Sequence, residues 1–179
     1  MDSDPPANVG IAESLAAGDP AAYAALYARL ARPLLRVAAA MLGGGAGEAE
    51  DVVHDVFVAL ARRREKLRRV EDLDAYVFAS LRHAIAARLE RRRTERRHLE
   101  RIAAMRDEAV GPPEMAVDDR LADALATLPP EQREVILLKV DAALTFAQIA
   151  EVLRISPNTA ASRYRYAIEK LRRCLEDRS

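Results

Sequence analysis

The sequence predicts an all-α protein of two small helical domains joined by a flexible linker, the C-terminal one a helix-turn-helix. Half of the 179 residues are hydrophobic, which is enough for a core, whereas only 4% are aromatic. Alanine is abundant, and the β-branched runs typical of strands are missing. Apolar residues recur at spacings of three and four in the predicted segments, the pattern of a buried helix face.

The N-terminal part of the chain is predicted to begin loosely and then form helices. Residues 1–18 contain two prolines and many small residues, so we expect a flexible N-terminus there. Asp19 followed by Pro20 predicts a helix start, and the glycine-rich run 43–47 predicts its end. A second helix over 48–64 has acidic residues in its first turns and arginines in its last, which matches the helix dipole.

A basic loop and a long helix follow. The loop has the sequence EKLRRVED, and the helix is predicted over 72–97, with arginines dominating its second half. Gly111, Pro112 and Pro113 lie between polar stretches and predict an inter-domain linker over 102–118. The two domains are therefore expected at 19–101 and 119–179.

The C-terminal domain is predicted to contain short helices and then a pair meeting at a tight turn. One short helix is expected over 121–128, and the next opens at Pro130. Within 144–171, Thr145 is a good N-cap and Gln148, three residues later, completes a capping box. Ser156 is a second N-cap, followed by proline at the first helical position.

The last helix has two different faces. Ala160, Tyr164, Ala167, Ile168 and Leu171 form its apolar stripe. Small, hydrogen-bonding and basic side chains occupy the opposite face, a composition that suits a DNA major groove. These candidates are Asn158, Thr159, Ala161, Ser162, Arg163 and Arg165. The alternative is a plain αα-hairpin whose arginines are merely solvated.

The net charge is zero, but its distribution is uneven. Residues 61–101 hold fourteen basic and seven acidic residues, and 142–179 hold seven and four. Residues 1–60 hold three basic and eight acidic, and 102–141 hold four and nine. Two basic segments alternating with two acidic ones predict two separate contacts with an anionic partner, and acidic faces that meet protein.

Other classes of protein receive little support. The single cysteine, Cys174, excludes an internal disulfide and fits a reducing compartment. No apolar run reaches 18 residues, so membrane insertion is not expected, and the acidic N-terminus does not resemble a signal peptide. His54, His83 and His98 lack metal-ligand spacing. Because no phosphate-binding loop or catalytic motif is present, we predict neither an enzyme nor a cofactor.

Two blocks of sequence resemble a known family. LTFAQIAEVLRISPNTAASRYRYAIEKLR, after an ALPPEQ-type opening, resembles the fourth region of bacterial RNA polymerase sigma factors. AEDVVHDVFVAL followed by DLDAYVFASLRHAIAARLERRR resembles their second region. The short linker in place of a third domain resembles the extracytoplasmic-function (ECF) type. The resemblance covers residues 19–101 and 119–175, in the family's order.

The resemblance implies a role for each block. The AEDVVHDVF helix would bind core RNA polymerase, and its exposed candidates are Asp51, His54, Asp55 and Val58. The basic loop and long helix would melt and read the minus-ten element, using Lys66, Arg68, Arg69, Tyr76, Arg82, His83, Arg88 and Arg91. The last helix would read the minus-thirty-five element. Two alternatives stay open here: for Tyr76, helical spacing favours a core position over base stacking, and the arginine run 91–97 could be a solvated helix end.

The sequence also departs from the family pattern. His54 stands where the family has glutamine, Tyr76 where it has tryptophan, and His83 where an asparagine helps to hold a flipped base. Arg154 replaces a turn glycine, so a left-handed residue is expected at a cost of about 1–2 kcal/mol. Ala160-Ala161 replaces a valine-lysine pair, with loss of a phosphate contact.

We therefore predict a cytoplasmic sigma factor whose partners are core RNA polymerase and promoter DNA, with an anti-sigma factor as a further candidate partner. Two other functions compete with it. One is a dimeric helix-turn-helix regulator, which would bind a palindrome without polymerase. The other is a sigma-like interaction module that binds no DNA.

Overall fold

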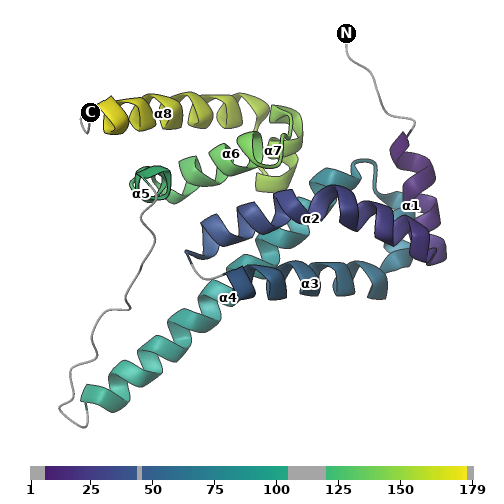
Figure 1. The fold of residues 1–179 in the computed structure, drawn as a ribbon, viewed down its shortest axis with the longest axis horizontal. Coiled ribbons are helices and arrows are strands. Elements are labelled where there is room, and N and C mark those ends of the chain that lie inside the picture. Colours follow the sequence, from purple (N-terminus) through teal and green to yellow (C-terminus); the bar gives the residue numbers. More distant parts are fainter. Residues whose placement is uncertain (1–6, 44–45, 105–119, 177–179) are drawn as a thin grey trace.

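The computed structural model describes residues 7–43, 46–104 and 120–176 (Figure 1). All regular secondary structure in these ranges is helical, which confirms the predicted all-α class. An N-terminal unit comprises α1 to α4, and a C-terminal unit comprises α5 to α8.

The N-terminal unit is built on two antiparallel helices and a long third one. Helix α2 spans Pro20–Leu42, α3 spans Ala46–Arg62, and α4 spans Leu73–Ala104. The predicted cap of α2 is present, since Oδ1 of Asp19 accepts from the Ala21 amide at 2.9 Å. Gly43 ends α2 in the left-handed conformation that glycine adopts without strain. Helix α4 runs past the predicted end at residue 97, and its second half extends away from the core (Figure 1).

Two predictions for the N-terminal unit are wrong. The segment predicted as flexible, 1–18, contains helix α1 over Ala7–Ala17. The basic loop contains a 3-10 helix, η1, over Arg64–Arg69. The two short helices pack against each other, and each contributes one completely buried side chain, Leu15 and Leu67. Tertiary packing thus stabilises helices too short to persist alone.

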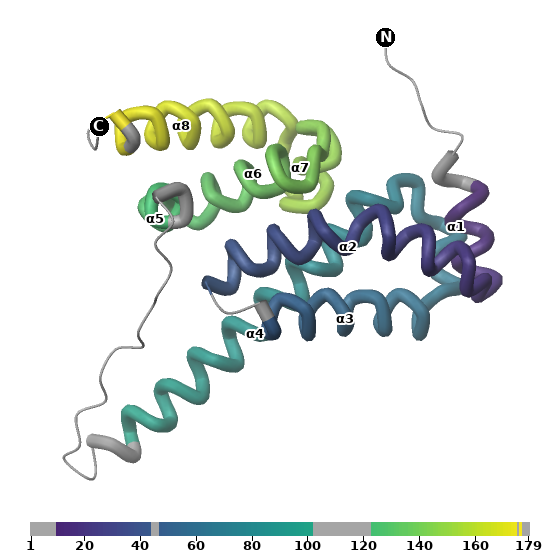
Figure 2. The backbone as a smooth tube through the Cα atoms, viewed as in Figure 1, coloured from purple at the N-terminus to yellow at the C-terminus, as the bar shows by residue number. Residues whose placement is uncertain are grey.

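The C-terminal unit contains four helices. They are α5 (Arg120–Ala126), α6 (Pro130–Val140), α7 (Phe146–Leu153) and α8 (Pro157–Glu176). Helix α8 packs against α5, α6 and α7, and α6 and α7 lie between it and the N-terminal unit (Figure 2).

The two units are packed together rather than separate. Helix α7 contacts α4 and α6 contacts α2, and buried side chains from both units form one apolar cluster. Helix α4 extends to Ala104, so it takes the first residues of the predicted linker 102–118, and the rest of that linker lies outside the described residues. The sequence predicted two domains joined by a linker but not how they pack, because an interface between distant segments leaves no local pattern.

Candidate functional site

The turn between α7 and α8 has the predicted helix-turn-helix geometry. Thr145 and Gln148 form a reciprocal capping box: the Thr145 amide donates to Oε1 of Gln148 at 2.8 Å, and the Gln148 amide donates to Oγ1 of Thr145 at 3.2 Å. Arg154 ends α7 in the left-handed conformation, with φ 55° and ψ 48°. Oγ of Ser156 then accepts from the Thr159 amide at 3.0 Å and caps α8.

Helix α8 buries its predicted stripe and exposes its predicted polar face. Ala160, Ala167 and Leu171 are buried, while Tyr164 stacks edge-to-face on Phe146 with ring centroids 5.7 Å apart. Of the six DNA candidates, Asn158, Thr159 and Arg165 are exposed, and Ala161, Ser162 and Arg163 are partly exposed.

A shallow groove and one further side chain extend this face. The groove is about 500 Å³ in volume, and its lining includes Phe146, Asn158, Ser162 and Arg165. Tyr166 is 61% exposed, although the sequence analysis did not select it. It stands four residues after Ser162, a helical spacing that places it on the same face and could have identified it.

The candidates on α3 lie together on one surface. Asp51, His54 and Asp55 are exposed and Val58 is partly exposed. Phe57 is only partly buried and packs edge-to-face on Tyr27, with centroids 5.0 Å apart. Because Tyr27 is 50% exposed, an aromatic pair adjoins the polar candidates.

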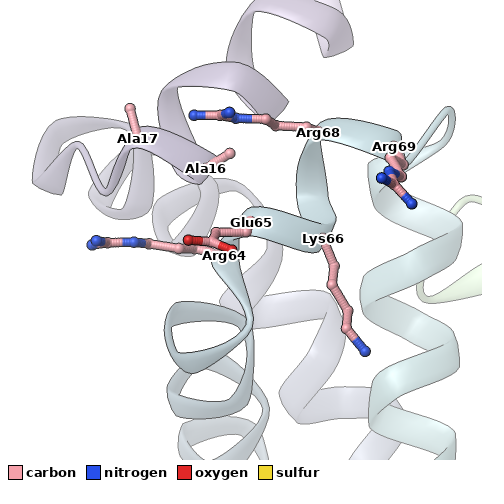
Figure 3. A pocket seen from close by; sticks show the side chains of 7 residues that line it. All are labelled: Ala16, Ala17, Arg64, Glu65, Lys66, Arg68 and Arg69. Atoms are coloured by element: carbon pink, nitrogen blue, oxygen red, sulfur yellow. The ribbon is translucent and has the colours of Figure 1, made fainter.

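The helices α1 and η1 enclose a cationic pocket of about 970 Å³ (Figure 3). Arg64, Lys66, Arg68 and Arg69 line it together with Glu65 and two alanines of α1. Arg64 packs so closely on Gly18, where φ is +85°, that any Cβ there would collide with its guanidinium. Burial raises the pKa of Tyr23, and the positive charge of Arg64 opposes that rise. Three predicted DNA candidates, Lys66, Arg68 and Arg69, therefore line the same pocket, although their side chains point in different directions (Figure 3).

The five candidates on α4 do not share one face. His83 is exposed, its Nδ1 atom 2.7 Å from the Ala79 carbonyl oxygen, and Arg91 is exposed as well. Tyr76 is partly buried against the core, in line with the core alternative. Arg82 contacts the C-terminal unit through Glu134.

Arg88, another of the α4 candidates, forms ion pairs with α3. Its Nε donates to Oε1 of Glu48 at 3.1 Å, and its Nη2 lies 3.5 Å from Oδ2 of Asp51. Arg92 also pairs with Glu48 and donates to the Leu42 carbonyl at 3.1 Å. Ion pairs with α3 therefore turn Arg88 and Arg92 toward the protein. The paired residues are more than 35 positions apart in the sequence, so no local pattern predicts these contacts.

Within the described ranges, no group of three or more histidine, cysteine or acidic side chains could hold a metal ion. None of the described helices is long and apolar enough to cross a membrane.

The two halves of the chain match two family models in the expected order. Sigma-70 region 2 matches residues 26–95, and sigma-70 region 4 matches residues 118–171. The chain is 32% identical over 172 residues to the ECF RNA polymerase sigma factor SigL of Mycobacterium tuberculosis, covering 90% of this chain and 93% of the relative. The chain belongs to the ECF sigma factors. Sigma factors are non-enzymatic, and this ECF sigma factor binds core RNA polymerase and directs promoter recognition and transcription initiation, as the sequence predicted.

Solved structures share the fold of this ECF sigma factor. CnrH, in complex with the cytosolic domain of CnrY, is 24% identical, and the superposition covers 97% of this chain and 99% of that one with a TM-score of 0.69. The sigma factor RpoE of Bartonella quintana, in complex with the anti-sigma factor NepR, is 22% identical, with 84% and 96% covered and a TM-score of 0.63.

Proposed function

We propose that three surfaces divide the work of this sigma factor. The α3 surface (Asp51, His54, Asp55 and Val58) binds core polymerase, with the Tyr27–Phe57 pair beside it. The cationic pocket at η1, with Tyr76, His83 and Arg91 of α4, binds the minus-ten element. The outward face of α8 reads the minus-thirty-five element.

The cationic pocket is the observation that carries the minus-ten assignment. Strand separation exposes phosphates and unstacked bases, and a protein that holds them needs cationic side chains around a recess. Four basic side chains and one acidic side chain line this pocket, a net charge of three positive units. The outward face of α8 supports the minus-thirty-five assignment. The first turn of this helix exposes short polar side chains, which suit a DNA groove.

Two further proposals concern the surroundings of the protein. We place it in the cytoplasm, where its polymerase partner is found. An anti-sigma protein is a candidate partner, since a structural neighbour, RpoE, was solved with one.

Permanganate reactivity of promoter thymines tests the minus-ten assignment, because it reports strand separation directly. The triple variant Lys66→Ala, Arg68→Ala, Arg69→Ala should lose reactivity with core polymerase while still binding that enzyme. Arg91→Ala should reduce open-complex formation more than initial duplex binding. A matched triple of exposed basic residues, Arg96→Ala, Arg97→Ala and Arg101→Ala, controls for charge. Parental reactivity in the pocket triple would remove η1 from the minus-ten site.

A further inference from the structure

The groove beside α8 opens on the outward face of that helix, yet its lining is mostly apolar. Four of the six minus-thirty-five candidates contribute to it: Asn158, Ala161, Ser162 and Arg165. Their spacings of three and four residues place them on one side of the helix. Two aromatic side chains, Phe146 at the start of α7 and Tyr164 of α8, complete the lining. The surface proposed to read DNA therefore includes an apolar recess.

The aromatic part of the groove is fixed by its own contacts. The Phe146 ring packs edge-to-face on Tyr164, with ring centroids 5.7 Å apart. The ammonium group of Lys139 lies over the Phe146 ring, 5.0 Å from its centroid, in a cation–π contact. That ammonium group also donates to the Leu144 carbonyl oxygen at 3.0 Å. Because the ring is held in advance, a ligand that enters the groove does not have to order it.

Ala161 keeps the groove open. Its side chain is a single methyl group on a partly exposed position, so it offers a ligand no hydrogen bond. A longer side chain at this position would occupy the recess. The nearest positive charge is held beside it, since Nη2 of Arg165 donates to Oγ of Ser162 at 3.4 Å. The groove thus combines an apolar lining with an adjacent guanidinium group.

We infer that this groove receives the 5-methyl group of one thymine in the minus-thirty-five element, with Phe146 and Ala161 as specificity-determining residues. The inference rests on the minus-thirty-five role proposed above for α8. Among the groups that base pairs present in the major groove, the thymine methyl is the apolar one. Any other base edge would place polar atoms against Phe146 and Ala161, where they find no partner. The exposed guanidinium of Arg165 then holds a neighbouring backbone phosphate.

Charge and continuity favour duplex DNA over an apolar protein segment as the occupant. Residues 157–168 contain two arginines and no acidic residue. The groove is continuous with the exposed side chains of Asn158 and Arg165. An apolar segment would cover the Phe146 ring but leave these polar groups without partners, whereas a duplex presents an apolar methyl group, polar base edges and phosphates side by side.

Replacement of thymine by deoxyuridine tests the inference, because deoxyuridine pairs in the same way but lacks the methyl group. The full chain is first assembled with purified core polymerase, and this holoenzyme selects upstream elements from a randomised duplex pool. Each thymine of the selected element is then replaced in turn, and competition binding gives the ratio of Kd values. We expect one position at which deoxyuridine weakens binding by about three- to five-fold, the effect of one buried methyl group.

The variant Ala161→Leu fills the groove and should bind the thymine and deoxyuridine duplexes alike. The matched control is Ala126→Leu, the same change at an exposed residue of α5. Helix α5 lies near the other end of α8 from α7, where Lys170 donates to the Thr127 carbonyl (Figure 1). The control should therefore keep the thymine preference. Circular dichroism checks that both variants retain their helical content, and the scan with the parent chain needs no variant.

Four results would overturn the inference. The parent could tolerate deoxyuridine at every position, or select an upstream element without thymine. Ala161→Leu could keep the preference shown by Ala126→Leu, which would place the methyl contact elsewhere. It could also co-purify less with core polymerase while its thymine preference is unchanged, which would make the groove a protein contact. Absence of any sequence preference in the upstream element contradicts the proposed function instead, whereas a clear preference without sensitivity to the methyl group contradicts the thymine groove alone.

Discussion

The Nε atom of Arg88 lies 3.1 Å from Oε1 of Glu48 and ties the middle of α4 to the first turn of α3. Arg92 pairs with the same carboxylate one turn later. Arg91, between them in sequence, is exposed and makes no ion pair with any described residue. One arginine-rich stretch thus contains two residues that hold the N-terminal unit together and one that is free to bind a partner.

We expect Arg88→Ala to lower the free energy of unfolding by about 1 kcal/mol, since Glu48 is only 16% exposed and would lose one of two guanidinium partners. Urea titration followed by circular dichroism measures the change. Arg91→Ala is the matched control and should stay within about 0.5 kcal/mol of the parent. If both variants lose the same free energy of unfolding, the Arg88–Glu48 pair has no specific role in stability.

The α3 surface is tested by His54→Ala combined with Asp55→Ala. Both side chains are exposed, so the double variant should keep its helical content and its melting temperature. Its association with purified core polymerase should weaken, because two of the three polar side chains of that surface are lost. Glu151→Ala, an exposed change on α7, is the control for altered charge. Co-purification of the double variant at the parental level would argue against α3 as the polymerase contact.

Arg163 and Arg165 should behave differently on the upstream element, because two residues apart on a helix they project in different directions. Arg163→Ala should flatten the preference at one or two base pairs, since a bidentate guanine contact contributes about 1–3 kcal/mol of discrimination. Arg165→Ala should weaken all sequences alike and lower the salt dependence by about one unit of slope.

Binding of each variant to a randomised upstream element, at two salt concentrations, separates these outcomes. Lys170, exposed later on α8, provides a control as Lys170→Ala. If Arg163→Ala retains the full sequence preference of the parent, direct readout by Arg163 is wrong.

Arg154 offers a stability prediction at the turn. With φ at 55°, this arginine occupies a conformation that costs non-glycine residues about 1–2 kcal/mol. Arg154→Gly removes that strain but loses more chain entropy on folding, so a net stabilisation of about 0.5–1 kcal/mol is expected. Arg154→Ala keeps the strain and should show no gain. Thermal and urea unfolding of both variants measure the difference, and a glycine variant less stable than the parent would contradict the strain.

The turn region was predictable because its determinants are local. Thr145 with Gln148, Ser156 with Pro157, and the left-handed Arg154 each act within a few residues, and each was found as predicted. The exposed positions of Asp51, His54 and Asp55 were likewise evident from helical spacing.

The remaining features depend on contacts between distant segments. Helix α1 has a weak sequence signal and is held by packing of Leu15 near η1. Arg88 meets a carboxylate 40 residues away, and Arg82 meets one 52 residues away. Single-sequence spacing reveals that such side chains are charged, but not which partner neutralises them.

Run-off transcription from a promoter library tests the central claim most directly. Purified core polymerase is assayed alone and with this chain, and the start sites of the transcripts are sequenced. A sigma factor with two DNA surfaces should give transcripts only when the chain is added, from templates that share two separated motifs upstream of the start. Transcript levels no higher than those of core polymerase alone, together with protection of a palindromic duplex in the absence of polymerase, would contradict the account.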